Sequence, residues 1–376
     1  MKKTVVFIIL IFVFLSAFTF SAYAESDTKS DELYQNQYNA SGAEKLEEML
    51  PKDTRDIIES FGIDPKNPQS FENFGSENIF SIIWETITQN FGEPFSAVMA
   101  IIGVLLIFAA IDGLMTDFGS NDISTFVCFM ATIFLLKPVY LLISGVEAVI
   151  RGMSGFMATF VPVYAGIIAS GGSVSTAGGY SALLLAVAEG ISQFLSFVFL
   201  PIVSGTMSLG VMGSISPITA AMRFAEWIKK SAVWIMGIIT TVFLSVLSIQ
   251  TTITAAADNV GIRTSKAVIS GTIPIMGPAI AETLNTARGC LSLLRSGVGI
   301  YGAVAVALLA LPFLLKILMW RLGMWVCSGV ADIFVMPKIS NLFKAVDFCL
   351  SILLGAVCFI AILFVISMTV VLKVGG

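Results

Sequence analysis

Long apolar stretches recur through most of this sequence, and they decide which structures the chain is able to form. Seven segments have the length and hydrophobicity of candidate membrane spans: residues 95–111, 123–149, 156–170, 183–203, 232–253, 298–320 and 348–372. Two shorter apolar runs, 203–215 and 322–335, are candidate part-spans. An α-helix of about 20 residues crosses the hydrocarbon core of a bilayer. Because lipid offers no hydrogen-bond partners to the backbone, we expect an all-α polytopic membrane protein with about seven spans.

The composition supports the same class of protein. Hydrophobic residues make up 56% of the chain and charged residues only 12%, compared with roughly 25% charged residues in soluble domains. The formal net charge of −4 is distributed unevenly, because residues 25–93 are strongly acidic whereas residues 94–376 carry a basic excess. We therefore expect two physically different regions, an acidic segment at 25–93 and a polytopic membrane domain at 94–376.

Residues 1–24 have the pattern of a signal peptide. Two lysines precede an apolar core, and Ala22 and Ala24 supply the small residues that a signal peptidase recognises. We expect cleavage before Glu25, and the alternative is an uncleaved first anchor. Under both interpretations the acidic segment begins on the non-cytoplasmic side of the membrane.

The acidic segment shows little hydrophobic periodicity over residues 25–50, which we expect to be flexible. Apolar residues then recur at helical spacing over 43–61, interrupted by Pro51, and this pattern predicts two short amphipathic helices. A third amphipathic pattern at 79–91 predicts a helix that lies on the membrane or against the bundle. A solvated spacer is the alternative interpretation of the whole segment.

Residues 251–296 lie between two apolar spans but are themselves only modestly apolar. Pro274, Gly277 and Pro278 stand near the middle of this stretch, and proline interrupts a helix because it lacks a backbone donor. Charged residues flank this break on both sides: Asp258, Arg263, Lys266, Glu282 and Arg288. The pattern predicts a helical hairpin with a broken tip, of the re-entrant type. Such a hairpin should pack inside the bundle or line an aqueous cavity, since interrupted backbone at membrane depth must not meet lipid.

Ionisable residues inside the apolar spans are candidate functional residues, because a charge in hydrocarbon is unfavourable without a partner or water. Glu189 and Gln193 lie one helical turn apart in the span 183–203, and Lys137 lies within 123–149. A Lys137–Glu189 pair inside the bundle is one interpretation, and a role in a transport path is the other. Both require these side chains to point inward.

Other polar features have a structural interpretation. Glu147 and Arg151 are four residues apart and can pair on one helix. Lys316 and Arg321 lie beside tryptophans and resemble anchors at the membrane interface. The glycine- and serine-rich run 170–179 predicts a flexible connection.

No residue pattern indicates an enzyme. The chain contains no histidine, which excludes the usual imidazole base and metal ligand, and it has no CxxC pair and no phosphate-binding GxxxxGK[ST] loop. Residues 297–302 match GxGxxG, but they open an apolar span and do not follow a strand. We expect no catalytic, cofactor, metal or nucleic-acid site.

The run DNVGIRTSKAVISGTIPIMGPAIAETLNTARGC at residues 258–290, followed by apolar spans, resembles the stage III sporulation protein AE family of endospore-forming bacteria. The resemblance implies a membrane subunit of the channel or secretion-like complex that connects mother cell and forespore and supports late forespore gene expression. It implies a place in the outer forespore membrane. The implied partners, besides membrane lipid, are other products of the same operon: an ATPase and ring-forming proteins of the intermembrane space.

Two other functions remain compatible with the residues. A secondary transporter or permease would also place charges and a broken helix within the membrane, although no convincing internal repeat is present. A purely structural platform that holds ring-forming partners would show the same composition.

Overall fold

The computed structural model describes residues 28–60, 92–114, 120–215, 219–272 and 277–374, together with 62, 64, 66, 84 and 86–88. The part that it describes consists of helices and turns without strands, so the all-α class is confirmed. Three short helices come first: α2 (Thr28–Ser41), α3 (Lys45–Glu48) and α4 (Lys52–Ser60). The long helices follow: α6 (Gly92–Leu114), α7 (Ser120–Ser170), α8 (Val174–Gln193), α9 (Leu200–Ile215), α10 (Thr219–Thr272), α11 (Gly277–Ile333) and α12 (Pro337–Val374), with a π-helical turn η2 (Phe194–Phe199) between α8 and α9.

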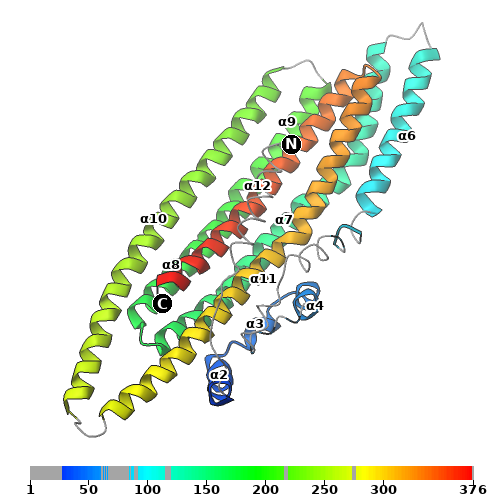
Figure 1. The fold of residues 1–376 in the computed structure, drawn as a ribbon. Helices are drawn as coiled ribbons and strands as arrows, with labels where there is room; N and C mark the ends of the chain where they lie inside the picture. Colours follow the sequence, from blue (N-terminus) through cyan, green and yellow to red (C-terminus); the bar gives the residue numbers. More distant parts are fainter. Residues whose placement is uncertain are drawn as a thin grey trace.

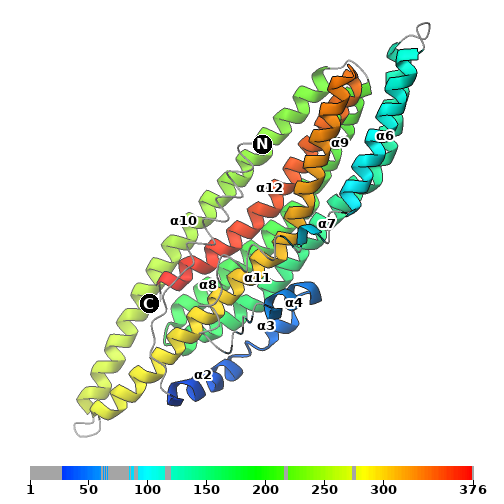
Figure 2. The ribbon, with the colours of Figure 1, turned by 45° about the vertical axis from the view of Figure 1, so that its right-hand side comes forward.

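The long helices form one elongated bundle in which α8 and α9 continue each other through η2 and the other neighbours along the chain run antiparallel (Figures 1 and 2). Helix α12 lies in the middle and contacts α11, α7, α9 and α10, and it is the most buried of the candidate spans. The end of α6 lies beside the start of α7 at one end of the bundle in Figure 1, where α9 also ends near the start of α10 and α11 near the start of α12. At the other end, which we call the hairpin end, α7 ends near the start of α8 and α10 near the start of α11.

Six helices, not seven, are long and apolar enough to cross a membrane within the described residues. The expected spans 123–149 and 156–170 are parts of the single helix α7, which contains Pro138 and Pro162. The charged residues between them do not interrupt the helix, because Arg151 pairs with Glu147 on the preceding turn, as predicted (2.6 Å).

The expected part-spans are continuations of longer helices. Residues 203–215 complete the continuous helical stretch formed by α8, η2 and α9. Residues 322–333 belong to α11, and the GxGxxG match at 297–302 is also helical within α11. Individual helices are therefore much longer than the apolar segments from which they were predicted.

The predicted hairpin at 251–296 is broken where its prolines stand. Helix α10 ends at Thr272 and α11 begins at Gly277, with Pro278 in its first turn, where proline is well tolerated. The two arms do not re-enter the bundle, however. They continue the adjacent spans directly and reach the outermost part of the hairpin end (Figures 1 and 2). This placement corrects the re-entrant expectation, and the polar character of the arms explains why they extend away from the apolar core.

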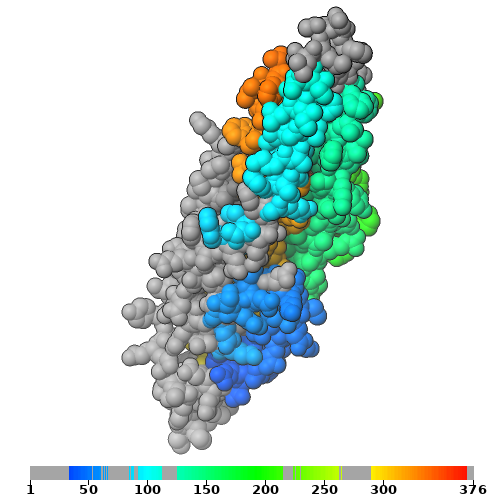
Figure 3. Space-filling view, turned by 90° about the vertical axis from the view of Figure 1, so that its right-hand side faces the viewer, coloured from blue at the N-terminus to red at the C-terminus, as the bar shows by residue number. Residues whose placement is uncertain are grey.

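Part of the acidic segment is ordered on the bundle, contrary to the flexible segment expected at 25–50. Helix α2 carries Tyr34 and Tyr38 one turn apart, and both side chains are buried. Helices α2 and α4 contact α11, and α2 and α3 contact α7, so the segment lies along one flank of the bundle (Figure 3). The two short helices predicted within 43–61 are present as α3 and α4. Residues 1–24 lie outside the described residues, as does most of the helix predicted at 79–91.

The connection between α7 and α8 is shorter than the flexible run predicted at 170–179. Three residues, 171–173, form the turn, and Gly172 adopts a φ of 94° that favours glycine. Helix α8 then begins at Val174, so residues 174–179 are helical.

Candidate functional site

Asp258, predicted from the sequence as a candidate residue, fixes the hairpin to the start of α8. Its Oδ1 accepts a hydrogen bond from the Ser175 backbone N–H and its Oδ2 accepts one from the Thr176 N–H, each at 2.9 Å. The α8 N-cap residue, Ser173, makes no side-chain capping bond. A carboxylate at this position satisfies free N–H groups and favours the positive end of the helix dipole. Asp258 is buried and belongs to α10, so α8 is capped by a residue of a different helix.

We expect Asp258→Ala to destabilise the protein by about 1–3 kcal/mol, because two backbone donors, of which the Thr176 N–H is buried, would lose their acceptor. Asp258→Asn retains one acceptor and should have a smaller effect. Thermal unfolding in detergent measures both variants, and Asn259→Ala is the control because Asn259 is exposed on the same helix. Equal melting temperatures for Asp258→Ala and the control would contradict the capping role.

Next to this junction, Arg295 of α11 is buried beside aromatic residues of α7 and α8. The rings of Phe156, Phe160 and Tyr164 stack in sequence, with centroids 5.8 and 5.2 Å apart. Tyr180 of α8 meets Tyr164 edge-on at 5.7 Å. Sequence reasoning missed this ladder, although aromatic residues at positions 156, 160 and 164 share one helical face.

The docked acidic segment meets α11 close to this ladder. Tyr38 and Glu47 lie within electrostatic range of Tyr301, which is almost fully buried. Burial raises the pKa of Tyr38, and nearby Glu47 raises it further. Partial burial also raises the pKa of the Glu47 carboxyl above its ordinary value of 4.5, while Lys66 acts in the opposite direction.

This raised pKa predicts pH-dependent docking of the segment. A raised folded-state pKa means that docking favours protonated Glu47. The contribution of Glu47 to the stability of docking is therefore complete below a pH of 4.5, and it is lost as the pH rises through the pKa of the docked carboxyl. Glu47→Gln should slow protease cleavage within α2–α4 at pH 7, and the difference from the parent should vanish near pH 4. Glu48→Gln is the control because Glu48 is exposed. Identical cleavage of all three proteins at pH 7 would refute this prediction.

Ion pairs at the opposite end of the bundle join α11 to its neighbours. Arg321 pairs with Asp347 of α12 at 2.7 Å, with the arginine side chain largely buried. Lys316 pairs with Glu93 of α6 at 2.9 Å. The sequence interpretation treated Lys316 and Arg321 as interface anchors and did not find these partners, which lie far away along the chain.

The contacts between helices define which residues lie at the same height along the bundle. Four pairs set the register: Phe160 packs on Gly302, the Ser154 hydroxyl donates to the Ala188 carbonyl at 3.4 Å, the Thr176 N–H donates to Asp258, and Arg321 pairs with Asp347. With a rise of about 1.5 Å per residue, five ranges share roughly one height: 296–315 of α11, 353–372 of α12, 236–255 of α10, 178–197 of α8 and η2, and 145–164 of α7. We call this the central level. It is roughly 30 Å thick, the thickness of a hydrocarbon core.

Charged residues are scarce at the central level. Its parts of α10, α11 and α12 contain none, and among the described residues its parts of α7 and α8 contain Glu147, Arg151 and Glu189. Helix α6 lies beyond this level, since Val98 packs on Gly323 of α11.

The predicted candidates Lys137 and Glu189 are not brought together. Ser154 lies beside Ala188, so Lys137 is some 17 residues, or about 25 Å, away from Glu189 along α7. Both side chains are exposed, whereas a pair or an inward path within one bundle would need buried positions. Glu189 instead accepts a hydrogen bond from Gln193 at 2.7 Å, which brings these two candidates together on the surface of α8.

Glu189 and Gln193 belong to an unusual exposed surface. Where α7 and the stretch 178–197 lie at the central level, most of their exposed residues are small or polar, although Phe197 of η2 is a large apolar side chain that is exposed. The members are Ala148, Arg151, Gly155, Ala158 and Pro162 of α7 with Gly178, Ala182, Ala186, Glu189 and Gln193 of α8. We call this surface the α7–α8 face. Small residues four apart on α8 were the sequence signal that could have identified it.

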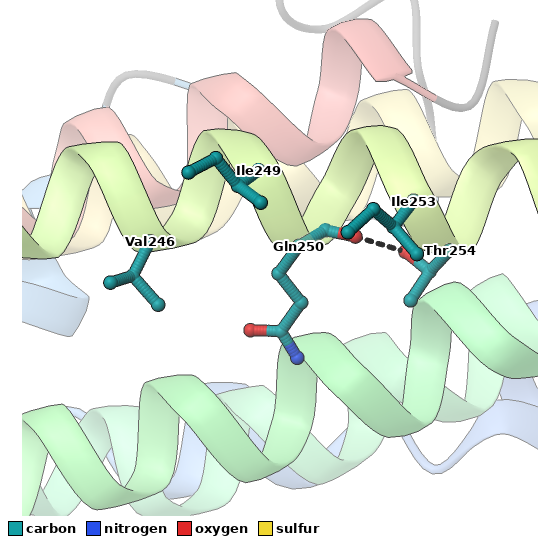
Figure 4. Close-up of a pocket in the computed structure, with 5 residues that line it drawn as sticks. All are labelled: Val246, Ile249, Gln250, Ile253 and Thr254. Carbon is teal, nitrogen blue, oxygen red and sulfur yellow. Dashed lines mark hydrogen bonds between the residues drawn. The ribbon is translucent and has the colours of Figure 1, made fainter.

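Helix α10 presents a different surface at the same level. A hollow of about 360 Å³ on α10 is lined by Val246, Ile249, Gln250, Ile253 and Thr254 (Figure 4). Gln250 points toward α8, where it meets Gly179, while the isoleucines are exposed and apolar. Exposed apolar side chains of this kind suit contact with lipid tails.

The remaining candidates lie on the hairpin arms. Arg263 and Lys266 belong to α10, and Glu282 and Arg288 belong to α11, where Gly277 and Pro278 form the first turn. The side chains of these residues and the whole of Pro274 lie outside the described part of the structure, so their predicted roles stay predictions.

Comparisons with known proteins agree on one family. The model of the family described as Stage III sporulation protein AE matches residues 68–375. The chain is 20% identical over 304 residues to Stage III sporulation protein AE of Bacillus subtilis (strain 168), an alignment that covers 79% of this chain and 75% of that relative. No solved structure matches the chain.

Proposed function

We propose that this chain, which belongs to the stage III sporulation protein AE family, is a membrane subunit of a channel or secretion-like complex between mother cell and forespore. Membership of the family makes it a sporulation protein, and its apolar helices make it an integral membrane protein. The proposed place is the outer forespore membrane, and the proposed role is support of late forespore gene expression. In this role the chain is not an enzyme.

The observation that carries this proposal is the length of the hairpin arms. Helices α10 and α11 contain 54 and 57 residues, which correspond to about 80 and 85 Å. A hydrocarbon core of about 30 Å accommodates less than half of either helix. The arms therefore extend well outside a membrane, which is the property that a subunit needs in order to reach other proteins.

The bundle also suggests an orientation. Basic residues follow the α9–α10 and α11–α12 connections at one end: Arg223, Lys230, Lys338 and Lys344. Basic loops favour the cytoplasmic side, so we place that end in the mother-cell cytoplasm. The hairpin end then faces the intermembrane space, on the same side as the exported segment 25–93. The arms carry basic residues too, which is why charges alone did not assign the topology from the sequence.

In this orientation the arms would reach ring-forming proteins of the intermembrane space, and the cytoplasmic end would reach an ATPase. Affinity purification of the tagged chain from sporulating cells should recover these products of the same operon. Arg263→Glu or Arg288→Glu should reduce recovery of the ring-forming proteins at least about fivefold. Arg223→Glu, at the other end, is the matched control and should spare them. Recovery that is insensitive to both arm substitutions would contradict a role of the arms in assembly.

A further inference from the structure

Large apolar side chains are exposed along only half of α7. They recur from Phe126 to Leu141 and include Phe134. From Leu142 to the end of the helix no large apolar side chain is exposed, and the exposed residues are small, charged or proline. The second half is also apolar in composition, but its large side chains, such as Phe160, are buried in the bundle. The two halves of one helix therefore suit different surroundings, lipid for the first and water for the second.

Neighbouring helices repeat the exposed apolar surface at the height of the first half of α7. The ring of Phe108 on α6 contacts the ring of Phe126, with centroids 6.1 Å apart. The Cys128 thiol donates to the Ser214 hydroxyl near the end of α9 at 3.8 Å. The exposed large apolar side chains of these neighbours are Phe95, Met99, Leu106, Ile107 and Ile111 of α6, Phe197, Val198, Ile202 and Met212 of η2 and α9, and Leu322, Trp325, Val326 and Ile333 of α11. With the first half of α7 they form an apolar level about 25 Å thick, close to the thickness of a hydrocarbon core.

Charged and polar side chains border this level on the side of the hairpin end. Glu93, which pairs with a lysine of α11, stands just before the apolar part of α6. Glu147 and Arg151 follow the apolar half of α7, and Glu189 and Gln193 precede the exposed apolar residues of η2. By the register these groups lie within about 12 Å of one height. Since ionisable side chains are unfavourable in hydrocarbon, this border marks a membrane surface.

The acidic segment docks beyond this border. Figure 3 shows it following α6 along one flank of the bundle, and both α2 and α6 contact α7 and α11. Tyr38 and Glu47 lie near Tyr301, which is 15 residues, or about 22 Å, from Lys316 along α11. The charged residues of the segment exclude it from hydrocarbon, so the bundle beside Tyr301 stands outside the membrane on this flank.

Helix α10 carries a similar apolar surface closer to the hairpin end. Its exposed large apolar side chains recur from Val233 to Ile253, over about 30 Å, and several of them line the hollow in Figure 4. Lys230 precedes this stretch and Asp258 follows it. The bond between Asp258 and Thr176 places the stretch about 25 Å closer to the hairpin end than the apolar half of α7. The apolar surface is therefore oblique to the bundle axis, as expected of helices that tilt in a bilayer.

Few exposed residues depart from this division. Lys137 is exposed at the apolar level on α7, and its long aliphatic stem lets the ammonium reach toward an interface. Arg321 and Asp347, at the same level, pair with each other. Val174 and Val260 are isolated exposed apolar residues beyond the apolar surface, which is ordinary where a helix faces water.

We propose that lipid covers the bundle only along this oblique surface, the lipid belt, and that the rest of the bundle stands in water beyond one membrane surface. The belt consists of residues 95–111 of α6, 126–141 of α7, 197–212 of η2 and α9, 233–253 of α10 and 322–333 of α11.

The projecting part then comprises residues 147–193 of α7 and α8, the hairpin arms and the docked acidic segment. Residues 156–170, predicted from the sequence as a separate span, form core of this projecting part. Glu189 and Gln193 lie at the membrane surface. The belt is the same for either orientation of the bundle and does not require the proposed channel role.

Spin-label accessibility tests the lipid belt. Single cysteines replace Phe134 and Ile249 inside the belt and Ala158 and Ala182 outside it, all at exposed positions. The labelled proteins are reconstituted in vesicles of phosphatidylethanolamine and phosphatidylglycerol. Collision with oxygen, which concentrates in lipid, is compared with collision with a water-soluble nickel chelate. The ratio of oxygen to nickel accessibility should be at least about fivefold higher at positions 134 and 249 than at positions 158 and 182.

Positions 158 and 249 give the sharpest comparison, because the register places them at nearly the same height on different helices. A membrane perpendicular to the bundle axis would give both positions the same ratio. The oblique belt gives a high ratio at position 249 and a low ratio at position 158. A lipid-like ratio at position 158, or a water-like ratio at position 249, would overturn the proposal.

Two backgrounds guard this experiment against misfolding. One lacks the native cysteines, and the other keeps all five, which are buried. The measurement uses purified protein, so its result is independent of partner proteins. A lipid-like ratio at position 158 together with normal recovery of operon partners would remove this inference and leave the proposed function intact. The expected ratios without any recovered partners would do the reverse.

Discussion

Replacing Gly302 by alanine should destabilise the bundle by about 3 kcal/mol and sharply reduce the yield of folded protein. A Cβ atom at this position would overlap the ring of Phe160, which is fully buried. The ring cannot move aside, because it is stacked between Phe156 and Tyr164. Overpacking of a filled core typically costs about 1–3 kcal/mol, and this rigid contact belongs at the upper limit.

Gly355→Ala is the matched control for this prediction. Gly355 lies within α12, and a Cβ there would meet nothing within 4 Å. Since alanine favours a helix over glycine by up to about 1 kcal/mol, this variant should be neutral or slightly more stable. Thermal unfolding in detergent compares the two. Similar melting temperatures for Gly302→Ala and Gly355→Ala would mean that α7 and α11 do not approach each other as closely as the structure indicates.

The double substitution Pro274→Ala and Pro278→Ala should abolish sporulation-linked activity while the protein still inserts into the membrane. Each proline disfavours a helix interior by about 3 kcal/mol, so its removal favours helix across residues 273–276. A continuous helix through this point would drive α10 and α11 apart from their antiparallel arrangement. A reporter of late forespore gene expression should then fall at least tenfold.

Membrane fractionation separates loss of function from loss of insertion in this experiment. Pro201→Ala is the control, because Pro201 is exposed in the first turn of α9, where its removal changes no connection between helices. A proline double variant with normal reporter expression would show that the break at the hairpin tip has no functional role.

Patterns local in the chain predicted the fold class, the pair Glu147–Arg151 and the break between α10 and α11. Each depends on residues within a few turns of one another. The continuity of α7 was missed because Arg151 and Gly152 look like a connection when their surroundings are unknown. The helix α2 was missed because its buried side consists of two tyrosines within a polar sequence.

Contacts over long sequence distances were beyond sequence reasoning. Asp258 was selected as a charged residue of the hairpin, but its role as the cap of α8 depends on residues more than 80 positions away. The exposure of Glu189 likewise follows from how α7 and α8 pack, and the sequence interpretation placed this side chain inside the bundle. The tertiary structure thus changed Glu189 from half of an expected internal pair into part of an exposed polar face.

The central claim is that the hairpin arms leave the membrane on one side and meet partner proteins there. Single cysteines along residues 261–295, in a background without native cysteines, test it when labelled from each side of the membrane. Positions at the ends of α10 and α11 should react from the intermembrane-space side only, and should become protected in sporulating cells that contain the operon partners. Protection without partners, or reaction from both sides, would contradict the claim.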